Sequence, residues 1–177
     1  MNSSTIGSMF LGLLLISQYP FAADARAHIG LQSSLISVVC STSSNKAECN
    51  AILGSSPLAA QAKNFRQLSK VVLEMAYNKA AAGQAFLKKL AASTKCPALT
   101  RCANFDYDGV VMSFRSALGE LKEDPQTANY DAKVASDGTA QCDRGMVAEH
   151  VVNPQVTALN SQINFYSELA FLVTNNL

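Results

Sequence analysis

Five cysteines are the residues of this sequence with the clearest capacity for chemistry: Cys40, Cys49, Cys96, Cys102 and Cys142. Thiols pair as disulfides in an oxidising compartment, or they bind zinc together with histidine. The sequence has no C-x-x-C motif, and its two histidines are distant from any pair of cysteines, so we expect no metal site. Because the number of cysteines is odd, at least one is left over when the others pair.

Acid–base chemistry has few candidates. Asp106 and Asp108 are two positions apart, and residues with that spacing on a helix do not face each other. Glu149 and His150 are adjacent but have no accompanying nucleophile, and nothing assigns a role to His28. Since no set of nucleophile, base and orienting group can be assembled, we expect a protein that is not an enzyme and needs no cofactor.

The totals indicate one globular domain. The chain has 177 residues, of which 49% are hydrophobic and 15% are charged, so it can form a substantial core. Its formal net charge is +1, which gives no general attraction for nucleic acid or for acidic membranes.

The N-terminal region has the pattern of a signal peptide. The apolar run Met9–Ile16 is too short to span a bilayer, and Ala23–Ala25 provides an Ala-x-Ala cleavage site. We expect residues 1–25 to be the signal peptide and residues 26–177 the mature, secreted domain, with no membrane contact after cleavage. Cleavage after Ala22 or Ala23 is the alternative, and the run has no Lys or Arg before it, so a buried N-terminal helix is the rival interpretation.

Apolar residues recur three and four positions apart in most of the remaining chain, and no segment alternates as a strand does. Residues 26–56 predict a helical hairpin with Cys40 and Cys49 at its neck. Long helices are expected over Leu58–Ala92, Leu99–Lys122, Thr127–Cys142 and from Asn153-Pro154 to the C-terminus. The sequence therefore predicts an all-α, disulfide-stabilised protein, in which an up-down-up-down four-helix bundle (57–177) follows an N-terminal helical hairpin.

The sequence also predicts where the first long helix begins and which face of the second long helix is buried. Ser56-Pro57 has the cap and first-turn proline typical of a helix start, so we expect the first long helix to begin there. The inner face of the second long helix is expected to comprise Cys102, Phe105, Val110, Phe114, Ala117 or Leu118, and Leu121.

The third long helix has little apolar surface and is expected to end at Cys142. A disulfide to Cys102, near the start of the antiparallel second helix, would hold it in place and is worth about 4 kcal/mol in the chain-entropy model. A bond from Cys96 to Cys142 closes a loop of similar length, so spacing leaves both pairings open.

The cysteine spacing, the long amphipathic helix and the segment A-S-D-G-x-x-x-C-D ending at Asp143 together resemble the plant invertase and pectin methylesterase inhibitor family. The resemblance covers Ile29 to Leu177. It implies the bonds Cys40–Cys49 and Cys102–Cys142, so Cys96 is left over as a free thiol or as an intermolecular link. It also implies a monomeric, reversible, pH-sensitive one-to-one inhibitor of the cell wall or apoplast, or of the vacuole.

The resemblance also separates two targets. Invertase inhibitors of this family place a Pro-Lys-Phe turn in the sucrose cleft, whereas the corresponding residues here are Pro125, Gln126 and Thr127. The missing cation and aromatic anchor favour pectin methylesterase as the partner, with acid invertase as the alternative. A non-enzymatic helical carrier or structural protein is a further alternative. In many members a tyrosine stands four residues after the cysteine, where this chain has Asp106 followed by Tyr107.

Charged residues are the candidates for partner contact. Lys63, Arg66 and Lys70 are expected on one stripe of the first long helix, where they could meet an acidic partner or simply face solvent. Asp131 lies on the third long helix, which belongs to the docking surface in the family, so it is a candidate for contact with a cation of pectin methylesterase. An interface of standard size would bury roughly 1,600 Å² in total.

Overall fold

The computed structural model describes residues 35–177, so the predicted signal peptide, the start of the hairpin and His28 lie outside the described residues. Within that range all regular structure is helical, and no helix is long and apolar enough to cross a membrane. The elements after a first helical stretch at residues 35–42 are α2 Lys46–Gly54, α3 Pro57–Ala60, α4 Phe65–Thr94, α5 Pro97–Arg101, the π-helical η1 Cys102–Asp106, α6 Tyr107–Glu120, α7 Pro125–Ala148 and α8 Pro154–Thr174.

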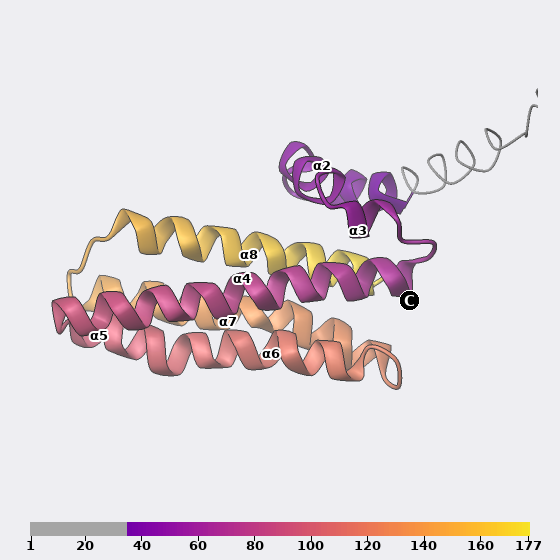
Figure 1. Cartoon of the computed structure of the whole chain (residues 1–177). Helices are drawn as coiled ribbons and strands as arrows, with labels where there is room; N and C mark the ends of the chain where they lie inside the picture. The colour runs from indigo at the N-terminus through magenta and orange to yellow at the C-terminus, as the bar shows by residue number, and fades with distance from the viewer. Residues whose placement is uncertain (1–34) are drawn as a thin grey trace, which may run out of the picture.

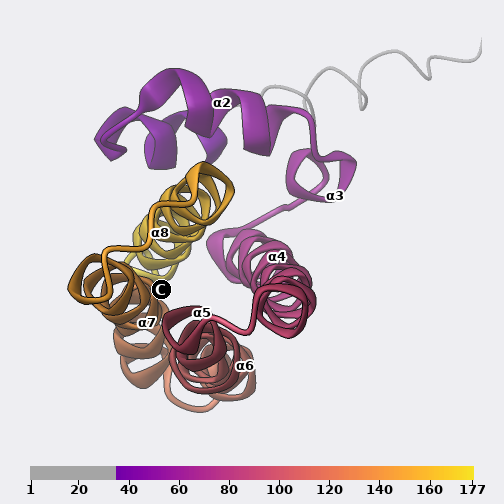
Figure 2. The same cartoon turned by 90° about the vertical axis from the view of Figure 1, so that its left-hand side faces the viewer.

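The four long helices form the predicted bundle. Helix α4 contacts α6 and α8, and α7 contacts the same two helices, so the four lie around one core (Figures 1 and 2). The largest fully buried side chains of the bundle come from α4, α6 and α8 and include Leu68, Leu73, Leu87, Tyr107, Phe114, Ile163 and Leu169. The fold therefore confirms the predicted all-α bundle with its preceding hairpin.

The hairpin packs against the bundle over α8 and α4 (Figure 2). A disulfide joins Cys40 to Cys49 across its turn, with 5.4 Å between the Cα atoms. Three groups of the turn donate hydrogen bonds to the Glu168 carboxylate on α8: Ser43 Oγ at 2.9 Å, Ser44 N at 2.6 Å and Ser44 Oγ at 2.5 Å. The disulfide closes the hairpin itself, and the Glu168 carboxylate attaches its turn to α8.

The first long helix begins later than the sequence predicts. Ser56 does cap a helix, with its Oγ accepting from Ala59 N at 3.2 Å, but that helix is the four-residue α3. A second cap, Asn64, accepts from Gln67 N at 2.9 Å and starts α4 at Phe65. Because α3 and α4 have separate starts, Leu58 is not part of the long helix.

The third long helix is longer than predicted and does not end at Cys142. Helix α7 continues to Ala148, and its buried positions are Ala128, Ala132, Ala135, Thr139, Cys142 and Met146. Apart from Met146, the side chains at these positions are small, so the backbone of α7 can approach the neighbouring helices closely and bury surface without large apolar groups. Cys142 is bonded to Cys102 from within the helix, with 4.8 Å between Cα atoms.

Candidate interaction surface

A single π-helical turn at Cys102–Asp106 decides which side chains α6 presents. The N–H of Tyr107 bonds to the carbonyl of Cys102, five residues earlier, so this turn holds one more residue than an α-helical turn. As a result Tyr107 points into the core and is fully buried, whereas Phe105 is 73% exposed. The prediction that Phe105 lies on the inner face is therefore wrong. The turn also brings Tyr107 inward although it follows Cys102 by five residues.

The buried Tyr107 joins three helices through polar groups. Its hydroxyl donates to Asn160 Oδ1 on α8 at 2.6 Å, and Asn160 Nδ2 donates to Asp143 Oδ1 on α7 at 2.6 Å. Burial raises the pKa of the Tyr107 hydroxyl far above its ordinary value, and the nearby Asp143 charge raises it further. The hydroxyl is therefore a permanent donor, and the network fixes α6, α7 and α8 relative to each other.

Helix α7 packs directly on the π-helical turn at Gly138. A Cβ atom at this position would lie 2.3 Å from the carbonyl oxygen of Asp106 and 2.5 Å from Val110 Cγ2. Only glycine leaves room for the two backbones to approach this closely. The Cys102–Cys142 bond crosses between the same elements one turn further along α7, so the turn is fixed at two neighbouring points.

Asp106 is the unusual polar residue of the turn. It is only 4% exposed, and its Oδ2 has no hydrogen-bond partner among the described residues. Its Oδ1 lies 3.7 Å from Arg101 Nε. Burial raises the pKa of the Asp106 carboxyl, and the charges of Arg101 and Arg144 oppose this only in part. The catalytic pairing of Asp106 with Asp108 has no support, because Asp108 is exposed.

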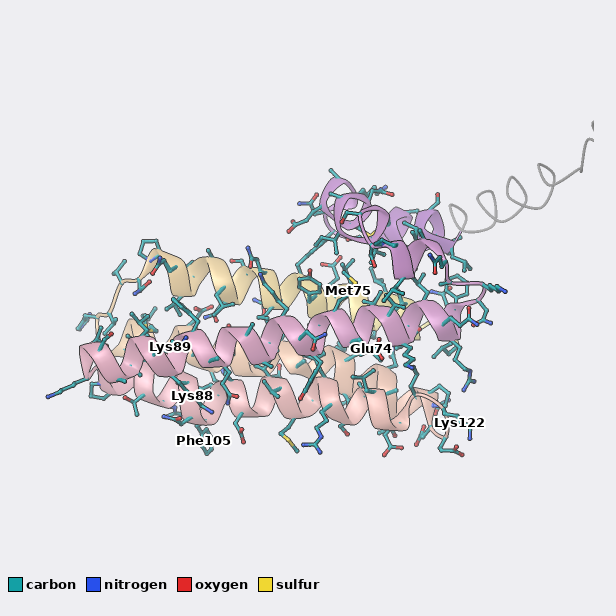
Figure 3. All side chains as sticks on the ribbon, viewed as in Figure 1. Glu74, Met75, Lys88, Lys89, Phe105 and Lys122 are labelled. Carbon is teal, nitrogen blue, oxygen red and sulfur yellow. A yellow bond between two sulfur atoms is a disulfide. The ribbon has the colours of Figure 1, made fainter. Side chains whose placement is uncertain are left out.

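A hollow of about 420 Å³ lies between this turn, α6 and α7. Its lining includes Arg101, Phe105 and Asp106 from the turn region and Tyr130 and Asp137 from α7. The exposed fraction of Tyr130 is 64%. Phe105 and Tyr130 are therefore large side chains exposed on the surface around this hollow, which we call the α6–α7 face, and Figure 3 shows Phe105 at the outer edge of the bundle. Sequence reasoning missed this face, apart from Asp131, because Phe105 was placed inside.

The predicted basic residues lie elsewhere. Arg66 and Lys70 line a groove of about 430 Å³ between α4 and α6, together with Lys122. Arg66 Nη1 donates to the carbonyls of Leu121 at 3.4 Å and Lys122 at 3.2 Å, so it caps the end of α6. Lys63 is exposed but precedes the first residue of α4 and is not on its helical stripe. Lys122 and Phe105 mark opposite ends of α6 in Figure 3, so this groove is separate from the hollow.

Three further residues singled out in the sequence, Asp131, Cys96 and Glu149, lie at separate places in the structure. Asp131 is half-buried on α7, seven residues before Gly138 and hence on the same edge, and it forms no ion pair with a described residue. Cys96 is a half-buried free thiol directly before α5. The Glu149 carboxylate accepts from Ala98 N at 3.0 Å, so it caps α5 and does not serve as a base for His150.

The residues that correspond to the Pro-Lys-Phe turn of invertase inhibitors lie in a helix. Pro125 is the first residue of α7, and Gln126 and Thr127 belong to its first turn, so no loop projects there. Among residues 35–177 no cluster of three or more histidine, cysteine or acidic side chains could hold a metal ion.

The fold and this surface define a small, disulfide-bonded four-helix bundle with a helical hairpin at its N-terminal end. A family model described as plant invertase/pectin methylesterase inhibitor matches residues 34–177. The chain therefore belongs to the plant invertase/pectin methylesterase inhibitor family. Comparison with curated protein sequences gives no match.

Two solved structures share the fold. A mutant form of a pectin methylesterase inhibitor from Arabidopsis is 21% identical with a TM-score of 0.60, and the match covers 80% of this chain and 96% of that one. A pectin methylesterase inhibitor from Arabidopsis thaliana is also 21% identical, with a TM-score of 0.57 and coverage of 81% and 95%. At this identity the likeness supports the fold and leaves the target to other arguments.

Proposed function

We propose that the protein is a secreted, monomeric inhibitor that blocks a cell-wall pectin methylesterase in a reversible one-to-one complex. It would act in the apoplast, and the vacuole is the alternative location. The observation that carries the proposal is the exposed aromatic side chains of the α6–α7 face, Phe105 and Tyr130. These side chains stand on helices fixed by the Cys102–Cys142 bond and by the Tyr107 network, so little conformational freedom is lost on binding.

The choice of pectin methylesterase over acid invertase rests on the start of α7. Gln126 and Thr127 supply neither a cation nor an aromatic ring to a sugar cleft, and both belong to the first helical turn. The names of the two solved structures described above agree with that choice. Asp131 is placed on the edge of α7 that faces α6, which keeps it a candidate for partner contact.

The test is a titration of the mature protein into assays of pectin methylesterase and acid invertase. We expect the first activity to fall with one-to-one stoichiometry and the second to remain. Loss of invertase activity alone would replace the proposed target by the alternative one. If neither activity falls and the protein takes up a fluorescent lipid, the carrier alternative holds.

The face is tested with paired substitutions. Tyr130→Ala on the α6–α7 face should weaken inhibition about tenfold, as expected for an exposed aromatic that becomes buried in an interface. Leu58→Ala removes a residue that is 61% exposed on α3, away from this face, and should leave inhibition unchanged. Equal effects of the two substitutions would place the interface elsewhere.

A further inference from the structure

A buried carboxylate lies beside the hollow at the π-helical turn. Asp106 is more than nine-tenths buried and belongs to the lining, and its Oδ2, which is itself fully buried, accepts no hydrogen bond from any described residue. Burying a carboxylate costs several kcal/mol unless a donor or a positive charge compensates it. The side chains of the folded protein therefore supply too few donors and too little positive charge to compensate the Asp106 carboxylate fully.

The protein's own Arg101 shows which chemistry suits the hollow. Its guanidinium carbon lies 6.0 Å from the centroid of the Phe105 ring, and its Nε lies 3.7 Å from Asp106 Oδ1. Both distances are long, because cation–π attraction extends to about 6 Å and a charge-assisted hydrogen bond is about 2.7–2.9 Å. The Arg101 side chain is also 60% exposed. A cation is thus held loosely between an aromatic ring and a buried carboxylate.

The rest of the lining favours positive charge as well. Asp137 and Tyr130 belong to α7 and line the hollow on the side of that helix. The charged groups of the lining are two carboxylates, Asp106 and Asp137, and one cation, Arg101. The lining itself therefore has one negative charge more than it has positive charges, which Arg144 nearby offsets only in part, so a cationic ligand is favoured over an anionic one.

We propose that this hollow receives a lysine or arginine side chain of the enzyme that binds the α6–α7 face, and that Arg101 occupies part of that place in the free protein. The proposal rests on the proposed function, since it names one contact of the same interface. The incoming cation binds between Phe105 and Asp106, and Arg101 turns out toward solvent. Arg101 is therefore a competitor of the partner and not a contact with it.

This role gives opposite signs to neighbouring substitutions, which a merely structural role would not. Arg101→Met retains an unbranched apolar side chain but removes the competing charge, so inhibition should become several-fold tighter. Phe105→Ala and Asp106→Asn remove the two groups that hold the cation, and each should weaken inhibition about tenfold. Asp108→Asn is the matched control, because it removes an exposed carboxylate near the hollow but outside its lining.

The inhibition constant of each variant is measured after circular dichroism and peptide mapping have shown an intact fold and an intact Cys102–Cys142 bond. Weaker inhibition by Arg101→Met would mean that Arg101 itself pairs with an acidic residue of the enzyme, and the proposal would be wrong. Unchanged inhibition by Phe105→Ala would overturn it equally. Phe105 is largely exposed, so its substitution reports on binding even if Asp106→Asn fails to fold.

A second measurement needs no enzyme and separates failure of this proposal from failure of the proposed function. Methylguanidinium is titrated into Arg101→Met and followed by the NMR signals of the Phe105 ring. We expect a saturable shift at millimolar concentrations that is lost in Arg101→Met/Asp106→Asn. Absence of the shift would refute the cation site, even if the wild-type protein inhibits pectin methylesterase. A shift caused by oligogalacturonate and not by methylguanidinium would identify a sugar subsite instead.

Discussion

Gly138 of α7 lies against the main-chain carbonyl of Asp106, where a Cβ atom would be 2.3 Å from the oxygen. Gly138→Ala should therefore lower the free energy of unfolding by about 1–3 kcal/mol, because the overlap is with backbone that cannot move aside easily. Urea unfolding at neutral pH measures the change. Gly145→Ala on the same helix is the control, since its Cβ would have no contact within 4 Å, and it should be neutral or slightly stabilising. Equal losses in both variants would show that the close approach does not exist.

Removal of the Tyr107 hydroxyl tests the buried network. Tyr107→Phe leaves Asn160 Oδ1 without its donor inside the core, so the free energy of unfolding should fall by about 1–3 kcal/mol. Tyr130→Phe removes the same group from an exposed ring and should cost nothing measurable. Thermal unfolding of both variants makes the comparison, and a silent Tyr107→Phe would contradict the hydrogen bond.

Asp106 should give the protein a particular dependence of stability on pH. Burial raises the pKa of its carboxyl, against the opposing charges of Arg101 and Arg144. The folded protein therefore keeps this proton to higher pH than the unfolded chain does. Between the ordinary and the raised pKa the free energy of unfolding falls as pH rises. Above the raised pKa the carboxylate is ionised in the folded protein, and stability is lower by the full cost of burying that charge.

Asp106→Asn removes this titration, so the stability of the wild type relative to this variant should be greatest in acid and decrease toward neutral pH. Urea unfolding at several pH values measures the difference. Asp108→Asn should show no such trend, because Asp108 is exposed. A difference between wild type and Asp106→Asn that is constant across pH would be inconsistent with a buried, poorly paired carboxyl.

Glu168 should have the opposite pH dependence at the hairpin. Burial alone would raise the pKa of its carboxyl, but the hydrogen bonds from Ser44 and Ser43 outweigh burial, and the pKa is lowered. Its stabilising contribution is present above the ordinary carboxyl pKa and is lost as pH falls through the lowered value. Attachment of the hairpin to α8 should therefore weaken as pH falls below the ordinary carboxyl pKa and through the lowered one.

Glu168→Gln keeps the shape of the side chain but removes its charge, which should weaken hairpin docking by about 1 kcal/mol. The amide of Ser44 donates to this carboxylate, so its hydrogen-exchange protection measures the effect directly. Glu123→Gln, at an exposed position whose ion pair with Lys122 lies wholly at the surface, is the control and should leave Ser44 protected. Unchanged protection in Glu168→Gln would argue against this attachment.

The sequence predicted the helices and their order, because amphipathic spacing and caps are local signals. Asn153-Pro154, for example, begins α8 as predicted, with Asn153 Oδ1 accepting from Gln155 N at 3.0 Å. The start at Ser56 was predicted too, but a cap does not reveal how long its helix will be. The length of α7 was underestimated, since alanines that pack by close approach carry little hydrophobic signal.

The candidate interaction surface was predicted far less well, for a physical reason. A π-helical turn is stabilised by its neighbours, here by Gly138 and by the Cys102–Cys142 bond, and not by the residues within it. Phe105 is therefore exposed, and Tyr107 is buried, without any local signal in the sequence. The one available sign was the offset of Tyr107 from Cys102 by one residue, which the resemblance identified as a departure but could not interpret.

The wide turn at Cys102–Asp106 also bears on how such chains can diverge. An extra residue in an ordinary helix would rotate every later side chain by about 100°, whereas a wide turn absorbs it and leaves the following residues in register. A single-codon insertion at this point can therefore change one exposed side chain while the hydrophobic interior is preserved. Selectivity for different enzymes could arise here by insertion or deletion, independently of the substitutions that maintain the scaffold.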